Sequence, residues 1–283
     1  MSINNCLLRL TGALNLTLVI SVAILLAASG FVASAQTFQT LYDFTGYSGL
    51  HGIPAYGPVS LTLGNDGNFY GTTDVNDGLF KMTTNGVVTT LVMGEVPNSL
   101  TLGIDGNFYG IYGPPGEGPL SGTLVRVTTS GLITVLVTND QFSFYYGQNA
   151  LTLGKDGSFY GTTRQGGDYN NGSVFKVTTT GVFTTLLSFN ITNGAGPNAL
   201  TLGNDGNFYG TASEGFNGFG SLFKVTSNGV LTTLAVFNFT NGANPTVAMT
   251  LGNDGNLYGT TSQGGITNSA FIYGMGTQPS HRI

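Results

Sequence analysis

The stretch LTLGNDGNFYGTT, residues 61–73, decides how this chain folds, because four nearly identical copies follow it. Within each copy an Asp-Gly pair separates two short apolar segments, and this pair permits the positive φ angles of a tight hairpin turn. Repetition of this kind specifies an architecture better than a reaction. The other copies are LTLGIDGNFYG at 100–110, LTLGKDGSFYGTT at 151–163, LTLGNDGNFYGTA at 200–212 and MTLGNDGNLYGTT at 249–261.

The later copies follow one another with a period of roughly fifty residues, which is typical of a β-propeller or another repeat array. Residues 149–189 show one period in full: NALTLG, the turn KDGS, FYGTT, a loop, GSVFKVTT, a second glycine-containing turn and VFTTLLSF. The four segments between the turns are rich in Val, Phe, Leu, Tyr and Thr, which suit strands. Each period is therefore predicted to be a four-stranded antiparallel meander.

Such a meander cannot be stable alone, because apolar side chains occupy adjacent positions in FYG and VFKV and both faces of the sheet need cover. Sheets stacked face to face around an axis supply that cover and leave few exposed edges. We therefore predict an all-β fold, a β-propeller of four-stranded antiparallel blades. The length of the chain suits five blades.

The two ends of the repeat region are complementary. The segment TFQTLYDF at 37–44 resembles a fourth strand such as TTLLSF at 184–189, but no first three strands precede it. The last repeat ends where its own fourth strand should begin. We expect the N-terminal strand to join the C-terminal blade and to close the propeller.

A tyrosine followed by glycine recurs in every copy, and a basic residue recurs in most of the predicted third strands. We expect the tyrosine hydroxyl to bind a backbone partner, and the glycine to let a third-strand aromatic lie across the backbone. We expect each basic side chain to pack its stem on aromatic rings. A ligand site repeated in every blade is the alternative. These residues are Tyr70, Tyr109, Tyr160, Tyr209 and Tyr258, with Lys81, Arg126, Lys176 and Lys224.

Residues 1–35 differ from the rest of the chain. Arg9 precedes an apolar run at 13–32 that ends in Ala33-Ser34-Ala35, the plan of a secretory signal peptide with its cleavage site. An uncleaved membrane anchor is the alternative. Cleavage after Ala35 would remove Cys6, the only cysteine, so disulfides and thiolate chemistry are not expected in residues 36–283.

Composition and charge narrow the possible partners and compartments. A formal net charge of −5 with 7% charged residues and 45 glycines fits neither a basic nucleic-acid binder nor a charged disordered chain. With the signal peptide removed, we expect residues 36–283 to form a single propeller domain that binds neither nucleic acid nor membrane. The expected location is outside the cytoplasm: extracellular, on the cell surface or in the periplasm.

The repeat unit resembles a known family. LTLGNDGNFYGTT, then GG, GSVFKVTTTG and TTLLSFN, is similar to the GloVer tandem repeat of exported bacterial proteins, with its DGNLYGTT core followed by GTVFK. The resemblance covers residues 37–273 and implies an exported protein without an established biochemical function, often with a C-terminal sorting anchor. After Tyr273 the sequence reads GMGTQPSHRI, in which no anchor is expected. The DGN turn also resembles lactonase-like and NHL propellers, but their metal or catalytic residues have no evident match.

The loops of the predicted propeller fall at two ends. The turns between first and second strands and between third and fourth strands are short and alike, and we call their end the uniform end. The remaining loops are long and different, and we call theirs the varied end; variable loops on a rigid scaffold usually carry binding sites. Its candidate binding residues are Tyr56, Glu117, Asp140, Tyr145, Tyr146, Arg164, Asp168, Tyr169, Glu214, Phe216 and Phe219.

Aromatic rings among carboxylates, amides and one arginine suit a carbohydrate or a protein partner, although the same residues could simply plug glycine-rich loops. With two histidines, His51 and His281, no histidine metal cluster is expected. The repeated aspartates lie in a turn too short to supply the roughly six to eight oxygens that calcium takes. We therefore assign no metal and no cofactor.

The sequence favours an exported, non-catalytic repeat protein that acts as a binding or scaffold module for carbohydrate or protein. The alternative is a propeller hydrolase or lyase that acts on a polysaccharide through loop carboxylates such as Glu117, Asp168 and Glu214. No residue is assigned a catalytic role, so the choice between module and enzyme stays open.

Overall fold

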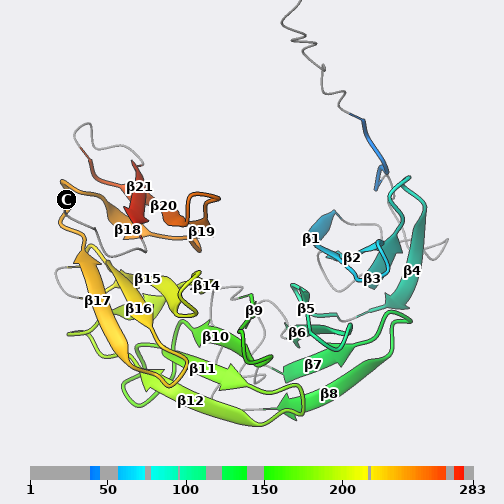
Figure 1. Ribbon diagram of the computed structural model, residues 1–283, viewed down its shortest axis with the longest axis horizontal. Coiled ribbons are helices and arrows are strands. Elements are labelled where there is room, and N and C mark those ends of the chain that lie inside the picture. Colours follow the sequence, from blue (N-terminus) through cyan, green and yellow to red (C-terminus); the bar gives the residue numbers. More distant parts are fainter. Residues whose placement is uncertain are drawn as a thin grey trace, which may run out of the picture. The chain divides into compact units, whose positions relative to one another are not determined.

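The computed structural model describes residues 39–44, 57–73, 78–94, 96–112, 123–138, 150–215, 218–265 and 271–276. Within these ranges the chain is all-β, and its strands form five antiparallel sheets (Figure 1). All five sheets belong to the unit Leu41–Ile283, which clusters separately from Met1–Thr40. None of the described residues forms a helix of the length and apolarity needed to cross a membrane. The predicted signal peptide lies outside the described residues.

The first three sheets each contain four strands that pair in chain order, as the repeat predicts. The first sheet consists of β1 (Pro58–Leu63), β2 (Phe69–Thr73), β3 (Gly78–Met82) and β4 (Val88–Met93). The second consists of β5 (Thr101–Leu102), β6 (Phe108–Tyr112), β7 (Thr123–Val127) and β8 (Ile133–Thr138). The third consists of β9 (Thr152–Leu153), β10 (Phe159–Thr163), β11 (Ser173–Val177) and β12 (Phe183–Ser188).

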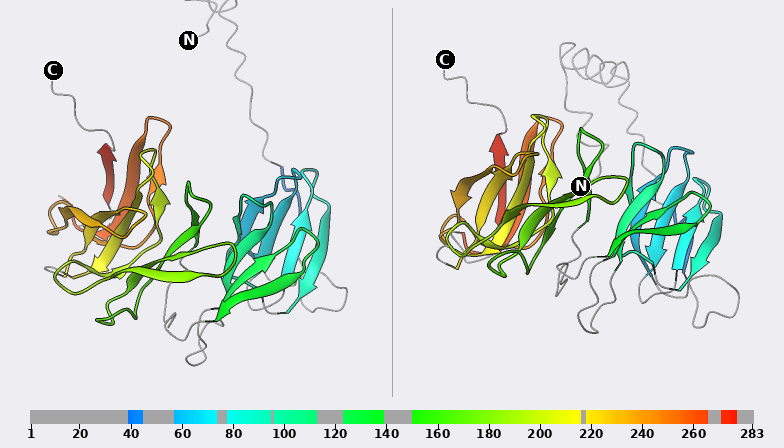
Figure 2. Two further views of the ribbon diagram at one scale, coloured as in Figure 1. Left: turned by 60° about the horizontal axis from the view of Figure 1, so that its bottom comes forward. Right: turned by 90° about the horizontal axis from the view of Figure 1, so that it is seen from below.

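The last two sheets differ, because each gains a short strand from the preceding link; β13 pairs with β15 and β18 pairs with β20. Figure 2 shows the sheets from two further sides. The fourth sheet consists of β13 (Ala195–Pro197), β14 (Thr201–Leu202), β15 (Phe208–Glu214), β16 (Ser221–Val225) and β17 (Leu231–Val236). The fifth consists of β18 (Ala243–Pro245), β19 (Thr250–Leu251), β20 (Asn256–Gln263) and β21 (Phe271–Gly276). The four-stranded antiparallel architecture predicted from the repeat is confirmed.

The core lies between neighbouring sheets. A buried second-strand tyrosine of one sheet packs its ring on the second-strand phenylalanine of the next. The ring centroids are 4.5 Å apart for Tyr70 and Phe108, and 4.0 Å apart for Tyr160 and Phe208. Aromatic pairs of this kind add to the stabilisation from burial. The repeated FY dipeptide thus serves two interfaces, because adjacent strand residues point to opposite faces.

The glycine after the tyrosine does what the sequence predicts where the third strand has an aromatic residue opposite it; Gly110, opposite Val125, is approached by Ser99 and Pro97 instead. Gly161 lies opposite Phe175 of β11. A Cβ atom at Gly161 would stand 2.9 Å from Phe175 Cε1 and nearer still to Cζ, so the ring lies directly across the bare backbone. Phe80 and Phe223 cover Gly71 and Gly210 in the same way.

The predicted closure by the N-terminal strand is not seen in the described residues. Residues 39–44 form no strand, and the Phe44 ring packs instead against Phe80 of the first sheet, with 5.2 Å between centroids. Among the residues that the structure describes, β21 pairs with β20 only. Closure and the number of blades therefore stay predictions.

Candidate functional site

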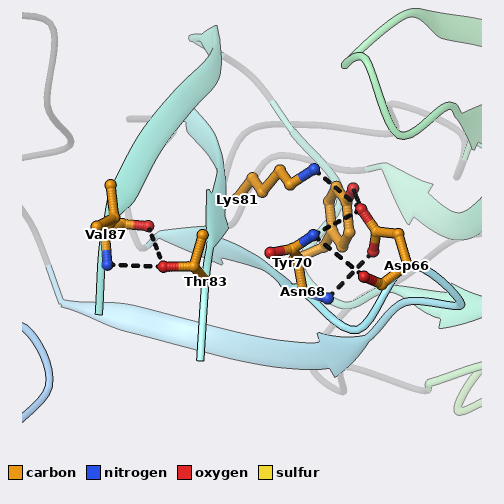
Figure 3. Close-up of polar contacts among 6 residues, drawn as sticks. All are labelled: Asp66, Asn68, Tyr70, Lys81, Thr83 and Val87. Carbon is orange, nitrogen blue, oxygen red and sulfur yellow. Dashed lines mark hydrogen bonds and ion pairs between the residues drawn. The ribbon is translucent and has the colours of Figure 1, made fainter. Parts of the chain in front are cut away.

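The uniform end carries a polar network that recurs with the repeat, drawn for the first copy in Figure 3. Asp66 Oδ1 accepts a hydrogen bond from the Asn68 backbone N–H at 3.2 Å, and its Oδ2 accepts from the Tyr70 hydroxyl at 2.9 Å. Lys81 Nζ forms an ion pair with the same Oδ2 at 2.9 Å. The aspartate therefore closes its own turn and anchors the neighbouring strand.

The sequence-based prediction that the tyrosine hydroxyl binds a backbone partner was wrong. In each copy the tyrosine donates to the carboxylate four residues earlier, not to a backbone carbonyl, because the Asp-Gly turn folds that carboxylate back over the ring. The other pairs, with their oxygen–oxygen distances, are Tyr109–Asp105 at 2.8 Å, Tyr160–Asp156 at 2.9 Å, Tyr209–Asp205 at 2.8 Å and Tyr258–Asp254 at 2.6 Å.

These contacts shift the acidities of both partners. Burial by itself raises the pKa of Asp156, but hydrogen bonds from Lys176, Ser158 and Tyr160 outweigh it and bring the pKa down to about 2. Burial, with the hydrogen bond to Asp105 second, raises the pKa of Tyr109 to about 12. At neutral pH the Asp156 carboxylate is therefore ionised and the Tyr109 hydroxyl protonated, which is the state that their hydrogen bonds require.

The basic residues of the third strands take the predicted position where the structure describes the contact. Lys81 Nζ lies 5.5 Å from the centre of the Tyr70 ring, and Lys176 Nζ lies 5.7 Å from that of Tyr160. The described residues contain no cluster of three or more His, Cys, Asp or Glu side chains that could hold a metal ion. The described aspartates, tyrosines and lysines of the uniform end take part in turn and packing contacts.

A second capped turn joins the third and fourth strands at this end. A threonine Oγ1 accepts the backbone N–H four residues later, and the intervening glycine has positive φ, as at Gly86 with φ 86°. Each of these N···O distances is 3.0 Å. The pairs are Thr83–Val87, Thr128–Leu132, Thr178–Val182 and Thr226–Val230.

The structure describes only part of the varied end. Of the candidate binding residues, Arg164, Asp168, Tyr169, Glu214 and Phe219 lie within the described ranges. The others lie outside them, namely Tyr56, Glu117, Asp140, Tyr145, Tyr146 and Phe216.

Arg164 and Glu214 come together across two sheets. Arg164 follows β10 directly and Glu214 ends β15, and Arg164 Nη2 lies 3.4 Å from Glu214 Oε1. The arginine stem passes over Gly196 of β13, where an added Cβ would meet its Cγ and Nε at 3.7 Å. Both side chains remain accessible, at 35% and 67% exposure. A solvated pair of this kind offers both a donor and an acceptor to a ligand but contributes little to stability.

The loop 164–172 holds its backbone in place and leaves Tyr169 in solvent. The Gly166 N–H donates to Asn170 Oδ1 at 3.1 Å, and the Asp168 N–H donates to Ser188 Oγ at 3.1 Å. The Gly196 N–H donates to the Asn171 carbonyl at 3.0 Å, which ties the loop to β13. Tyr169 is 59% exposed. The loop therefore presents an accessible aromatic ring on a hydrogen-bonded backbone.

Phe219 plays a different part from Tyr169. Its ring lies 5.8 Å from that of Phe239, and its carbonyl accepts the Asn244 N–H at 2.9 Å. The residue is half-buried and joins the loop after β15 to the link before β18.

Sequence reasoning missed Asn198, which organises the varied end from within. This side chain is 7% exposed, and its Nδ2 donates to Thr211 Oγ1 at 2.9 Å and to the Pro245 carbonyl at 2.8 Å. The backbone carbonyl of Asn198 accepts a hydrogen bond from Thr162 Oγ1 at 3.0 Å. The signal was an asparagine before the repeat core, present also at Asn98, whose carbonyl accepts from a second-strand threonine in the same way.

Comparison with solved structures identifies the fold. Virginiamycin B lyase from Staphylococcus aureus matches with a TM-score of 0.56 and 20% identity, over 81% of this chain and 72% of that one. Regucalcin, a calcium-binding protein from Agrobacterium tumefaciens, matches with a TM-score of 0.53 and 16% identity, over 80% of each chain. A chain of a nidogen/laminin complex matches with a TM-score of 0.53 and 17% identity, over 79% of this chain and 78% of that one.

These similarities show a β-propeller fold and no more, because the identities are low. Among curated proteins nothing matches. The family model described as Gloeobacter/Verrucomicrobia repeat matches residues 96–282, which is most of the repeat region. The chain therefore belongs to the Gloeobacter/Verrucomicrobia repeat family.

Proposed function

We propose that this protein is an exported, non-catalytic propeller that binds carbohydrate or protein through its varied end. The observation that carries the proposal is the loop 164–172, whose backbone is held by hydrogen bonds to Asn170 and to Ser188 while the Tyr169 side chain is exposed. A backbone already held in place loses little entropy on binding, and the flat face of an exposed ring can stack on an apolar surface of a ligand. The Arg164–Glu214 pair adds an exposed donor and acceptor, reached from the same loop and from β15.

The surroundings of Glu214 favour binding over catalysis. Catalytic carboxylates usually lie in clefts that exclude water. Glu214 instead is 67% exposed and beside a guanidinium.

The test is a screen of the purified protein against glycan and peptide arrays, followed by titration calorimetry of the hits. Tyr169→Ala should weaken binding at least about tenfold, which corresponds to about 1.4 kcal/mol. The matched control is Val182→Ala, which truncates a side chain of 61% exposure at the uniform end and should leave affinity unchanged. The proposal fails if no array member binds, or if a hit is turned over and Glu214→Gln or Asp168→Asn abolishes the turnover.

Export is a separate proposal that rests on the signal-like residues 1–35. Its test is the intact mass of the protein recovered from the periplasm or the medium of a bacterial host. An intact mass equal to that of a chain beginning at Gln36 supports export with cleavage. Recovery of the full-length chain from the cytoplasm alone would contradict it.

A further inference from the structure

The Arg164–Glu214 pair lies where the third and fourth sheets meet at the varied end. Arg164 follows β10, and its stem passes over Gly196 of β13. Glu214 ends β15 and pairs with Ala195 of β13, so the ladder between these strands fixes the place from which the carboxylate extends. Arg164 Nη2 and Glu214 Oε1 lie 3.4 Å apart, and both side chains are accessible. A hydrogen-bond donor and an acceptor are thus held side by side at the surface.

The next interface, between the fourth and fifth sheets, has neutral residues in these two places. Ser213 is the equivalent of Arg164, because each comes directly after the strand residue that lies opposite a third-strand serine. Gln263 is the equivalent of Glu214, because each pairs with the alanine of the short added strand. The two charges therefore replace a serine and a glutamine of the repeat, one on each side of a single interface.

Stability does not account for this departure from the repeat. Exposed ion pairs contribute little to folding, because water and salt screen the charges and two long side chains lose freedom. The interface between the fourth and fifth sheets forms with Ser213 and Gln263 in the equivalent places. A local departure that does not serve the fold is a candidate for binding.

The described residues of the varied end carry no surplus of positive charge. Arg164 is the one described basic residue there, and it is accompanied by Glu214 across the interface and by Asp168 in its own loop. An anionic polysaccharide would meet more negative than positive charge at these residues, so a neutral ligand fits better. The other described basic residues lie in third strands or in an Asp-Gly turn, namely Lys81, Arg126, Lys155, Lys176 and Lys224.

The loops beside the pair are rich in neutral hydrogen-bonding groups. The Oδ1 atoms of Asn170, Asn190 and Asn193 each accept a backbone N–H of their own loop. Since the oxygen and the NH2 group of an amide point apart, each held oxygen leaves an NH2 donor for a ligand. In the loops that carry these asparagines, the exposed large apolar side chains are Tyr169 and Ile191. Such loops suit a hydroxylated ligand better than the apolar centre of a protein interface.

Hydroxyl groups match a donor and an acceptor that lie side by side. A hydroxyl both donates and accepts, whereas a guanidinium only donates and a carboxylate only accepts. One sugar hydroxyl can therefore accept from Arg164 while the hydroxyl on the adjacent carbon donates to Glu214, and hydrogen bonds to charged groups are the stronger kind. Tyr169, in the same loop as Arg164, offers an exposed ring on which the apolar face of a sugar can stack.

We propose that the Arg164–Glu214 pair binds two neighbouring hydroxyl groups of a sugar, so that the ligand of the varied end is a neutral glycan with free vicinal diols. This inference rests on the proposed function and narrows it from carbohydrate or protein to one class of carbohydrate. The charged pair occurs at one interface among the described residues, so one such site per chain is expected.

Titration calorimetry of the purified protein with four glycans tests the inference. Cello-oligosaccharides and manno-oligosaccharides leave two neighbouring ring hydroxyls free on each internal sugar. Laminarin contains the same glucose as the cello-oligosaccharides, but its linkage occupies the middle ring hydroxyl, so its unbranched internal sugars have no neighbouring pair. Polygalacturonate keeps the neighbouring pair and adds a carboxylate to each sugar. The comparison thus separates the need for a diol from the effect of charge.

The better of the two neutral, diol-bearing oligosaccharides should bind at least about tenfold more tightly than laminarin and polygalacturonate. Arg164→Ser and Glu214→Gln introduce the residues of the next interface, so each should leave the melting temperature unchanged. Each should weaken binding of this oligosaccharide at least about tenfold. The matched control is Lys155→Asn, which removes an exposed cation at the uniform end and introduces the asparagine of the equivalent turns; it should leave the affinity unchanged.

Several outcomes would overturn the inference: no binding of either diol-bearing oligosaccharide, binding of laminarin or polygalacturonate that is equal or tighter, or full affinity in either variant. The proposed function has its own separate test in the glycan and peptide arrays. An array hit that is a peptide, or a glycan without vicinal hydroxyls, would support the proposed function and contradict this inference.

Discussion

Replacing Gly161 with alanine places one methyl group where the structure has no room for it. The new Cβ would stand 2.9 Å from Phe175 Cε1 and 3.1 Å from Cε2, distances at which the ring must move. Phe175 is 1% exposed and packs against Phe183, with ring centroids 5.3 Å apart. The ring is therefore held from behind, and the strain cannot be relieved locally.

The expected loss follows from two opposing effects. Overpacking a core by one methyl group usually costs about 1–3 kcal/mol. Alanine also reduces the freedom of the unfolded chain, which offsets about 0.4–1 kcal/mol. We expect Gly161→Ala to lower the free energy of unfolding by about 1–2 kcal/mol, or the melting temperature by roughly 2–8 °C for a domain of this size.

Urea unfolding followed by circular dichroism measures the loss, provided that the m-value is unchanged. The control is Gly57→Ala, whose added Cβ would meet nothing within 4 Å. A double-mutant cycle with Phe175→Val isolates the contact, since the three atoms nearest to the added Cβ all belong to the Phe175 ring. A Gly161→Ala variant as stable as the control, or a cycle in which the two losses simply add, would refute the reasoning.

Three further predictions concern other parts of the fold. Ala212→Thr should raise the free energy of unfolding by about 1 kcal/mol. The buried Ser221 hydroxyl has no hydrogen-bond partner among the described residues, whereas the equivalent Ser173 hydroxyl of the third sheet is paired with Thr163 Oγ1. An unchanged urea midpoint would contradict this prediction. The Asp156 pKa falls on folding from 3.8 to about 2, so the contribution of this carboxylate to the free energy of unfolding is present above pH 4 and is lost as the pH drops toward 2. The acid unfolding of Asp156→Asn should therefore depend less on pH across that window. Deleting residues 36–44 should lower the melting temperature, and an unchanged value would argue against closure by this segment.

Much of the fold could be predicted because the same pattern of turn and strand residues recurs in every copy of the repeat. The Asp-Gly turns, the strand order and the aromatic that covers Gly161 follow from local rules of conformation and size. The partner of the Tyr160 hydroxyl could not be predicted in the same way. Its acceptor, Asp156, is chosen by how the turn folds back in space, and spacing along the chain does not reveal that geometry.

The varied end was less predictable for a related reason. Its loops lack the repeat, so sequence could name polar and aromatic candidates without saying which of them meet. The structure brings Arg164 to Glu214, leaves Tyr169 exposed and turns Phe219 toward Phe239. Asn198 escaped notice because a buried asparagine and a solvent-exposed one look the same in a sequence.

The sequence by itself determined the unit of this protein: a four-stranded sheet with fixed turns, repeated, with apolar residues on both faces. Those features depend on backbone conformation and on side chains close together along the chain, so they are legible without coordinates. Only the tertiary structure decided which face meets which, where the carboxylates find their donors, and which apolar residues, such as Leu61 and Ile272, are left uncovered. Those outcomes depend on distances between residues of different sheets, and such distances are properties of the folded chain alone.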